Sequence, residues 1–343
     1  MLSVSARGGL RDAPPPYAET DLAAASLPGT DAINLVKPMF DVRSFRVAHE
    51  NLGRLGILGS SGTGASDSDL QRAHGTGEMV LAGSDRGTCI VDVFQRSPIR
   101  IMFPRSGGGA IGESVLVNTA GGVAGGDRFD CGVTALAGAS IAVTSQAAEK
   151  VYRALSEPAR IATRLTACEA AKLAWLPQET IFFNCARLNR RTEIDLASGA
   201  ELLALESLVL GRVAHGEEVV GGYISDSWRV RKDGRLIWAD TFRVTDETFS
   251  HLHRKALLSD CRAVGTLVYF GPNLDARFSS MRDIAHSLAC ECRCAATSVG
   301  GLIVVRFAAK LSSDLRDALR GFLGQFADKF GPGPFQVPKM WSC

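Results

Sequence analysis

The stretch NTAGGVAGGDRF, residues 118–129, places four glycines within six positions and follows them with an acidic and a basic residue. These glycines are Gly121, Gly122, Gly125 and Gly126. A Walker loop needs a lysine and a hydroxyl residue after its last glycine, whereas here Asp127 follows and would repel phosphate. A dinucleotide fingerprint needs the spacing G-x-G-x-x-G at the start of a helix, which GGVAGG does not have. The stretch therefore predicts a sharp strand-to-strand turn on backbone with positive φ, in which Asp127 caps free amide groups.

The chain on both sides of this turn reads as short β-strands. Residues 87–95 and 99–103 are two strand-like runs around a Ser-Pro pair, and residues 159–166 alternate between two faces. An Asp-Gly pair within residues 232–235 predicts a tight hairpin turn. The sequence therefore predicts a protein of mainly β class.

Helical patterns are few and lie toward the C-terminus. Residues 274–288 are a moderate helical pattern, and residues 312–330 repeat leucine and phenylalanine at helical spacing. Ser312 and Ser313 are candidate caps at the start of the second helix, and the Gly-Pro repeat after residue 330 ends it. We expect this last helix to cover the sheet.

Composition limits the class of protein. The chain has 343 residues, a net charge of +2 and 46% hydrophobic residues, enough for a sizeable core. The near-balanced charge points neither to nucleic acid nor to a membrane surface as a partner. The sequence contains neither a transmembrane run nor a signal-peptide core, so we expect a cytoplasmic protein. Its nine cysteines are an odd number in strand-like segments, which favours reduced thiols over a disulfide framework.

The N-terminal part of the chain differs in composition from the rest. Residues 1–70 contain the breaker and linker segments APPP, LPGT and GSSGTGASDSD. We predict that they are disordered or form an extension. Residues 71–343 are predicted to form a single β domain with helices at its C-terminal end.

Two short segments carry residues that bind metals in other proteins. CECRC holds Cys290, Cys292 and Cys294, and HLH holds His251 and His253. Alternate residues of a strand lie about 6.6 Å apart, whereas two sulfurs on one zinc lie roughly 3.8 Å apart. A straight strand cannot chelate with such thiols, but a bent loop can, so we read the cysteines first as thiols packed on one face of a strand.

The motifs of common hydrolases are missing from this sequence. It has neither G-x-S-x-G nor H-E-x-x-H. Cys185 has no neighbours that mark a nucleophile, and His215 beside two glutamates reads as a solvent-facing turn. Because no catalytic set emerges, the residues favour a binding or assembly protein over an enzyme.

Several ordered segments together resemble one family, the urease accessory protein UreD, also called UreH. They are VLVNTAGGVAGGDRFD (115–130), TSQAAEKVYR (144–153), LAWLPQETIFFNCARLNRRTEIDL (173–196), LLALESLVLGRVAHGE (202–217), GRLIWADTFRV (234–244) and PKMW (338–341). The resemblance covers residues 76–343 and leaves the N-terminal extension unexplained. Residues 246–262 and 275–298, which hold the histidines and cysteines named above, depart from the family pattern.

The resemblance implies a fold and a function. Members of this family are non-enzymatic β proteins with strands stacked in layers, in a helical, solenoid-like arrangement with a few α-helices. They bind urease structural subunits without their metal, together with UreF, which recruits the GTPase UreG. The complex delivers Ni²⁺ to the urease active site, and GTP hydrolysis belongs to UreG. The resemblance thus implies no tightly bound cofactor, with transient Ni²⁺ as cargo.

A nickel path should bind its ion weakly, because a deep energy well would trap it. Carboxylates suit this better than a cluster of thiols or imidazoles. Within the family-like segments the candidate path residues are Asp127, Glu149, Glu179 and Glu206. Each of these also fits an ordinary salt bridge.

Candidate interface residues are Lys150, Tyr152 and Arg153, which combine an aromatic ring with two cations. Two other functions remain open on the sequence. One is a Cys/His metal-dependent enzyme that uses the cysteines and histidines described above. The other is a β scaffold with a different client.

Overall fold

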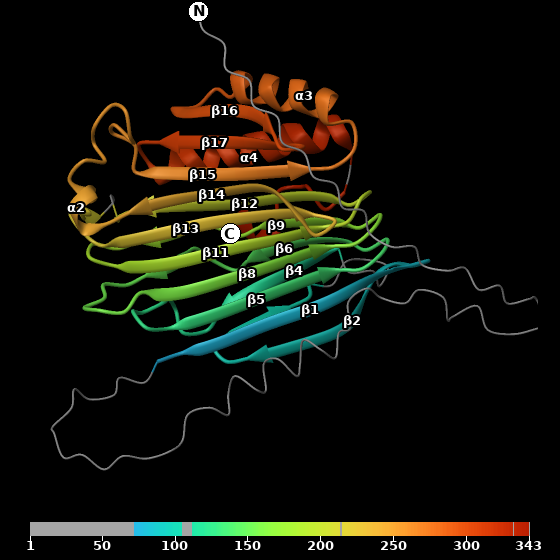
Figure 1. Cartoon of the computed structure of the whole chain (residues 1–343), viewed down its shortest axis with the longest axis horizontal. Coiled ribbons are helices and arrows are strands. Elements are labelled where there is room, and N and C mark those ends of the chain that lie inside the picture. The colour runs from blue at the N-terminus through green and yellow to red at the C-terminus, as the bar shows by residue number, and fades with distance from the viewer. Residues whose placement is uncertain (1–71, 105–111, 213–214, 332, 343) are drawn as a thin grey trace, which may run out of the picture. The chain divides into compact units, whose positions relative to one another are not determined.

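The computed structural model describes residues 72–342 except residues 105–111, 213–214 and 332. The prediction for residues 1–70 falls outside this range and stays a prediction. The described residues form two β-sheets, one of seven and one of ten strands. Figure 1 shows the strands of both sheets running side by side through the molecule.

The strands of the seven-stranded sheet, in sheet order, are β14 (Arg235–Val244), β13 (Tyr223–Lys232), β11 (Arg187–Leu196), β8 (Ala159–Ala167), β5 (Arg128–Ala135), β1 (His74–Ser84) and β2 (Gly87–Arg96). The main path of the ten-stranded sheet is β16 (Cys292–Val299), β17 (Leu302–Ala309), β15 (Ala263–Phe270), β12 (Glu201–Leu210), β9 (Lys172–Leu176), β6 (Ser140–Ser145), β4 (Glu113–Asn118) and β3 (Ile99–Met102). Two short strands, β7 (Glu149–Val151) and β10 (Thr180–Phe182), pair with each other, and β10 also pairs with β12.

The chain passes back and forth between the two sheets and so forms a solenoid. After β4 it enters the seven-stranded sheet at β5, returns to β6, and repeats this through β8, β9, β11, β12 and β13. Strands β5, β8, β11 and β13 therefore pair in parallel, as do β4, β6, β9 and β12. The mainly β, solenoid-like class expected from the family resemblance is confirmed.

Alternating side chains create the core between the sheets. In β11 every second residue, from Leu188 to Leu196, is buried, and the residues between them face outward. Strand β12 is buried along its whole length because it is covered on both faces. Its Leu202 packs between the sheets, whereas Leu203 packs against the helices.

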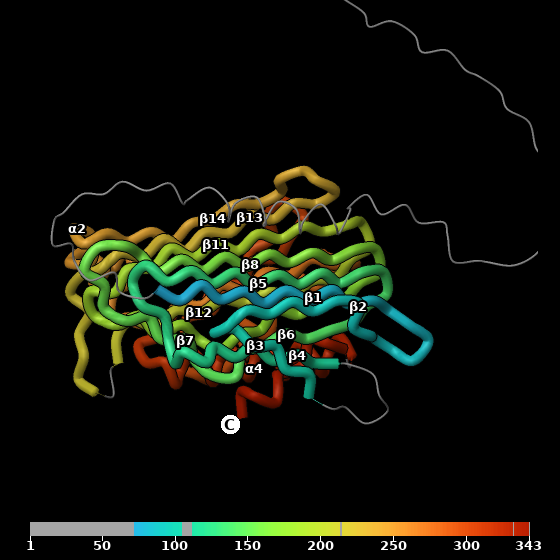
Figure 2. Tube along the Cα trace, turned by 90° about the horizontal axis from the view of Figure 1, so that it is seen from below, coloured from blue at the N-terminus to red at the C-terminus, as the bar shows by residue number. Residues whose placement is uncertain are grey.

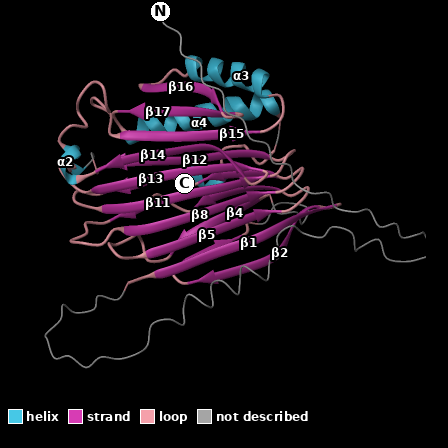
Figure 3. Cartoon of the chain, in the orientation of Figure 1, coloured by secondary structure: helices cyan, strands magenta, loops and turns pink. Residues whose placement is uncertain are grey.

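The helices are α2 (Asp246–Phe249), α3 (Leu274–Ser287), α4 (Ser312–Phe330) and the 3₁₀ turn η2 (Lys339–Ser342). All of them follow β14 in the chain, as expected, and Figure 3 shows α3 and α4 beside strands β15, β16 and β17. Helix α4 has the predicted bounds, and its apolar face packs on the ten-stranded sheet. The predicted serine caps are wrong: Leu311 is the N-cap, no side chain caps the helix, and Ser312 is already helical.

The two ends of the solenoid differ in their connections. One end, here called the turn end, holds short turns such as residues 136–139, 168–171 and 197–200. It also holds the predicted hairpin, where Asp233 and Gly234 adopt φ of 49° and 77°. The other end, the loop end, holds the longer connections 119–127, 152–158, 211–222 and 245–262, together with the four-residue connection 183–186. The glycine-rich stretch therefore lies at the loop end, between β4 and β5.

Candidate functional site

The glycine-rich stretch is a turn whose backbone leaves little room for side chains. Gly121, Gly122 and Gly126 adopt φ of 74°, 153° and 87°, values that L-residues rarely adopt. A Cβ on Gly122 would lie 2.3 Å from the ring of Tyr152. Gly125 has no positive φ, but a Cβ there would lie 2.5 Å from that of Ala154. Backbone conformation and close approach together explain the four glycines.

Asp127 holds this turn together. Its two carboxylate oxygens accept hydrogen bonds from the backbone amides of Ala73 and Ala124, each at 2.8 Å. The side chain is buried and fixes the turn to the start of β1. This is the capping expected from the sequence, and a part for Asp127 in nickel transfer stays a prediction.

Glu149 lies beside the same turn, at the start of β7. The amide nitrogen of Asn118 donates to both of its carboxylate oxygens at 3.1 Å and also to the carbonyl of Gly122 at 3.0 Å. Burial raises the pKa of Glu149 from 4.5 to about 7, although these hydrogen bonds oppose the shift. This carboxyl group therefore changes charge near neutral pH.

We expect the stability of the chain to fall as pH rises from about 4.5 to about 7 through the titration of Glu149. The folded state holds this proton more tightly than the unfolded state, so the contribution is complete below the unfolded pKa and lost above the folded one. The total is at most about 3.5 kcal/mol, from about 1.4 kcal/mol for each pKa unit. Denaturation at several pH values should show the slope in the wild type and not in Glu149→Gln. An equal slope in both would contradict the assignment.

Glu179 links the ten-stranded sheet to helix α4. Its carboxylate forms an ion pair with Arg316 of α4, and its carbonyl accepts the backbone amide of Glu149 at 2.9 Å. Glu179 directly precedes β10, in which Thr180 lies opposite Glu149 of β7. Glu149 therefore lies opposite the residue that follows Glu179.

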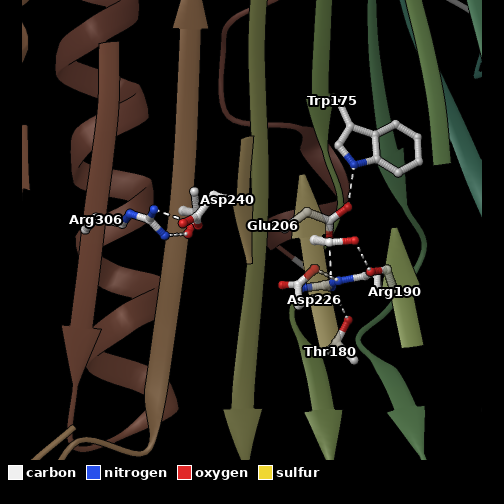
Figure 4. Close-up of polar contacts among 9 residues, drawn as sticks. Trp175, Thr180, Arg190, Glu206, Asp226, Asp240 and Arg306 are labelled. Atoms are coloured by element: carbon white, nitrogen blue, oxygen red, sulfur yellow. Dashed lines mark hydrogen bonds and ion pairs between the residues drawn. The ribbon is translucent and has the colours of Figure 1, made fainter. Parts of the chain in front are cut away.

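Glu206 belongs to a buried network that joins the two sheets (Figure 4). It accepts hydrogen bonds from the indole of Trp175 at 2.8 Å and from Arg190 at 2.7 Å. Arg190 also binds both oxygens of Asp226, at 3.0 and 2.7 Å, and donates to Thr180 at 3.0 Å. Arg190 and Asp226 come from the seven-stranded sheet, whereas the other three residues come from the ten-stranded sheet.

The electrostatics of this network are unbalanced. One guanidinium faces two carboxylates, so full ionisation leaves one excess negative charge in the interior. Burial raises the pKa of Glu206, and the charge of Asp226 adds to the rise, while Arg190 opposes it. Burial lowers the pKa of Arg190, but the two carboxylates outweigh this and raise it above its usual value, so the guanidinium stays charged. Such a site attracts either a proton or a second cation.

Electrostatics also connects Glu149 with Glu206. Both raise the pKa of the buried thiol of Cys131, which reaches about 12 chiefly through burial. Cys131 lies on β5 and points into the core between the sheets. The structure thus places Glu149 on β7 and Glu206 on β12, on either side of β10, with Asp127 in the turn beside β7. Glu179 directly precedes β10, and its carboxylate pairs with Arg316 of α4.

Sequence reasoning singled out Glu206 but missed its partners Arg190 and Asp226. Both could have been found from the alternation of their strands. Arg190 lies on the same face of β11 as the buried residues Leu188 and Ile194, and Asp226 lies on the same face of β13 as its buried neighbours. A charged residue on the buried face of a strand requires a partner of opposite charge in the core.

The candidate interface residues lie at the loop end. Lys150 and Arg153 are exposed. Tyr152 is partly exposed, donates its hydroxyl to the carbonyl of Gly121 at 2.9 Å and packs edge-on against Phe183. The carbonyl of Gly121 and the ring of Phe183 thus fix the ring of Tyr152 beside two exposed cations, and the role of these three residues in docking stays a prediction.

The cysteines and histidines of the alternative enzyme hypothesis lie in separate environments. Cys292 and Cys294 are half-buried on one face of β16, and Cys290 packs beside them. Burial raises the pKa of Cys292 to about 11 and that of Cys294 to about 12, so neither is an activated thiolate. His251 and His253 are exposed in the segment after α2. Within the described residues, no three His, Cys, Asp or Glu side chains are grouped to hold a metal ion.

A cavity of about 380 Å³ opens at the turn end, far from these carboxylates along the strands. Its walls include Lys232, Phe270 and the backbone of Gly199, Gly271 and Gly301. None of the predicted site residues lines it, so the cavity is separate from the candidate path.

The fold is a two-sheet β-solenoid with helices on one face and with the buried carboxylates of Glu206 and Asp226 between its sheets. Residues 73–342 match the sequence model of the family described as UreD urease accessory protein. The chain is 38% identical over 275 residues to urease accessory protein UreD 2 of Methylorubrum populi, which covers 79% of this chain and 91% of that protein. It is 41% identical over 256 residues to urease accessory protein UreD 1 of Methylobacterium radiotolerans, covering 74% and 86%. The chain therefore belongs to the UreD urease accessory protein family.

Membership of this family confirms the resemblance and gives the chain a role in urease maturation, as a non-enzymatic accessory protein that works with urease assembly components. Across the part of the chain that the structure describes, no helix is both long and apolar enough for a membrane span.

Proposed function

We propose that this chain is a scaffold that binds the urease apoprotein together with UreF and UreG and assists delivery of Ni²⁺ to the urease active site. One observation supports this beyond family membership. Glu149 begins β7 and Glu206 lies on β12, the two strands that pair with β10 on either side, and Glu206 belongs to the buried network between the sheets. In this proposal UreG hydrolyses GTP, and the scaffold holds no permanent cofactor.

The carboxylates suit transfer rather than storage of a cation. Glu149 carries hydrogen bonds from Asn118, Glu179 is paired with Arg316, and Glu206 is paired with Arg190. An entering ion must compete with these partners and, at Glu149, with a proton. Ni²⁺ would therefore bind weakly at each point, which lets it move on.

The test is co-expression of the urease structural subunits with the other accessory proteins in a host without urease, with and without this chain. We expect nickel content and urea hydrolysis to require the chain, and a complex that contains it to co-purify with the apoprotein. Equal nickel content and equal activity without the chain would refute the proposal. The Cys/His enzyme would then be tested through stoichiometric metal in the purified chain.

We expect Glu149→Gln and Glu206→Gln to lower the rate of nickel loading roughly ten-fold or more, the scale seen when a ligand environment is disturbed. Glutamine keeps the shape of the side chain and removes the charge that a cation needs. Glu157→Gln, an exposed change near the loop end, is the matched control and should load nickel normally. The measurement is bound nickel per urease active site over time, in complexes of equal composition. Normal loading by both interior variants would exclude them from the path.

A further inference from the structure

The outer face of the seven-stranded sheet is open, in contrast to the ten-stranded sheet. Helices α3 and α4 pack on the ten-stranded sheet. Figure 2 shows α4 on one side of the molecule and strands β8, β11, β13 and β14 on the other. Among the described elements, no helix covers these four strands, so their outward side chains form a broad β surface.

This surface is rich in arginine. The outward side chains of β8, β11, β13 and β14 include seven arginines but two carboxylates, those of Glu193 and Asp195. The arginines are Arg160, Arg164, Arg187, Arg191, Arg229, Arg231 and Arg243. We call this set the arginine face.

The pairing register arranges these charges in rows across the sheet. Arg164, Glu193 and Arg229 are neighbours in one row. Glu193 is already paired with Arg191 and Arg231, and Arg164 pairs with Asp130 of β5 at 3.5 Å.

Two cations of the face have no carboxylate partner among the described residues. Arg229 forms no ion pair, and Arg243 contacts the ring of Tyr223, with its guanidinium carbon 5.8 Å from the ring centre. Arg187 lies 5.6 Å from the same ring centre. Tyrosine among arginines is the composition of interface hot spots. Arg187 pairs with Asp246 at 2.9 Å, so the cations of the face without a carboxylate partner among the described residues are Arg229 and Arg243.

The chemistry of the face favours a protein over a nucleic acid. Glu193 and Asp195 lie among the arginines, a mixed-charge pattern that a protein surface can complement and a uniformly anionic phosphate backbone cannot. Guanidinium groups are weakly hydrated and match carboxylates with two parallel hydrogen bonds. Four strands of about ten residues span roughly 600 Å², near the contribution of one partner to a standard interface.

The face adjoins the loop end, where the candidate path begins. Arg187 and Tyr223 are the first residues of β11 and β13, and Arg243 lies near the end of β14, all at the loop end. A partner seated here would therefore reach the region of Glu149 without crossing the scaffold.

We propose that the arginine face docks an acidic surface of the urease apoprotein. This rests on the proposed function, in which the apoprotein is the client. The face gives the orientation of the complex: the client lies against the open sheet and the ten-stranded sheet with its helices points away.

The test compares two double charge reversals within the full accessory complex. Arg229→Glu with Arg243→Glu changes the face, whereas Arg100→Glu with Arg320→Glu makes the same charge change at exposed positions on β3 and α4. We expect the first pair to reduce co-purification with tagged urease apoprotein at least about ten-fold, since like charges then meet across the interface. The control pair should bind as the wild type does. Wild-type binding should also weaken between about 50 and 500 mM salt.

Different failures have different meanings. If the wild-type chain does not bind the apoprotein at all, the proposed function itself fails. If the wild type binds, but both double variants bind equally or salt has no effect, the arginine face is not the docking surface and the scaffold function stands. The inference would also fail if Arg229→Glu with Arg243→Glu lost only UreF, or if the wild-type chain bound duplex DNA instead of the apoprotein. Arg229→Gln with Arg243→Gln repeats the comparison without introducing acidic groups into the sheet.

Discussion

Replacing Arg190 by alanine should lower the free energy of unfolding by about 3–5 kcal/mol, the cost of removing one partner of a buried ion pair. The guanidinium is buried and forms hydrogen bonds with Glu206, Asp226 and Thr180. Without it two carboxylates remain in the core between the sheets, and each must stay charged without a partner or bind a proton. The loss should appear as a lower denaturation midpoint and a smaller soluble yield.

Two comparisons isolate this effect. Arg191→Ala removes the neighbouring arginine, which is half exposed on the outer face, and should change stability by no more than about 0.5 kcal/mol. Adding Glu206→Gln and Asp226→Asn to Arg190→Ala should recover part of the loss, because the stranded charges disappear. Equal stability of Arg190→Ala and Arg191→Ala would mean that the network does not hold the sheets together.

Gly122→Ala should destabilise the chain by about 2–4 kcal/mol, through backbone strain and overpacking together. Its φ is 153°, and the new Cβ would lie 2.3 Å from the ring of Tyr152 and 2.9 Å from the carbonyl oxygen of Lys150. The ring is fixed by its hydroxyl and by Phe183, and the carbonyl is backbone, so neither can move away cheaply.

Gly121→Ala provides the matched control for this prediction. Gly121 also has positive φ, but a Cβ there meets no atom within 4 Å. Gly121→Ala should therefore lower the free energy of unfolding only by the conformational cost of positive φ, about 1 kcal/mol. Denaturation of both variants and the wild type under the same conditions would separate the two costs. If both variants lose the same stability, close packing against Tyr152 plays no part.

Local patterns in the sequence predict the local structure well. The Asp-Gly pair at residues 233–234 forms its hairpin, and the leucines and phenylalanines of residues 312–330 form one helix. These features depend on the preferences of a few adjacent residues, so a short window contains the information. The glycine turn at residues 118–129 is also a local feature. The spacing of its glycines and the charge of Asp127 were enough to exclude a phosphate-binding loop.

Long-range pairing is what a single sequence does not show. Glu206 lies in the core because Arg190 and Asp226 stand opposite it on the other sheet, and these residues are 16 and 20 positions away along the chain. Parallel strands carry no local mark of their register. The alternation of Leu188, Arg190 and Thr192 shows that an arginine points inward, but only the fold identifies the carboxylates that meet it.

The same back-and-forth path has a consequence for synthesis in the cell. Along most of each sheet the spatial order of strands follows their order in the chain, so each new coil can settle on the one completed before it as the polypeptide leaves the ribosome. The exception is the last segment. Trp341 returns to hydrogen-bond Thr144 of β6 and the carbonyl of Leu176 of β9, at 3.3 and 3.2 Å. Trp341 therefore binds strands that lie up to 197 positions earlier in the chain, so this contact forms only after residue 341 has been synthesised.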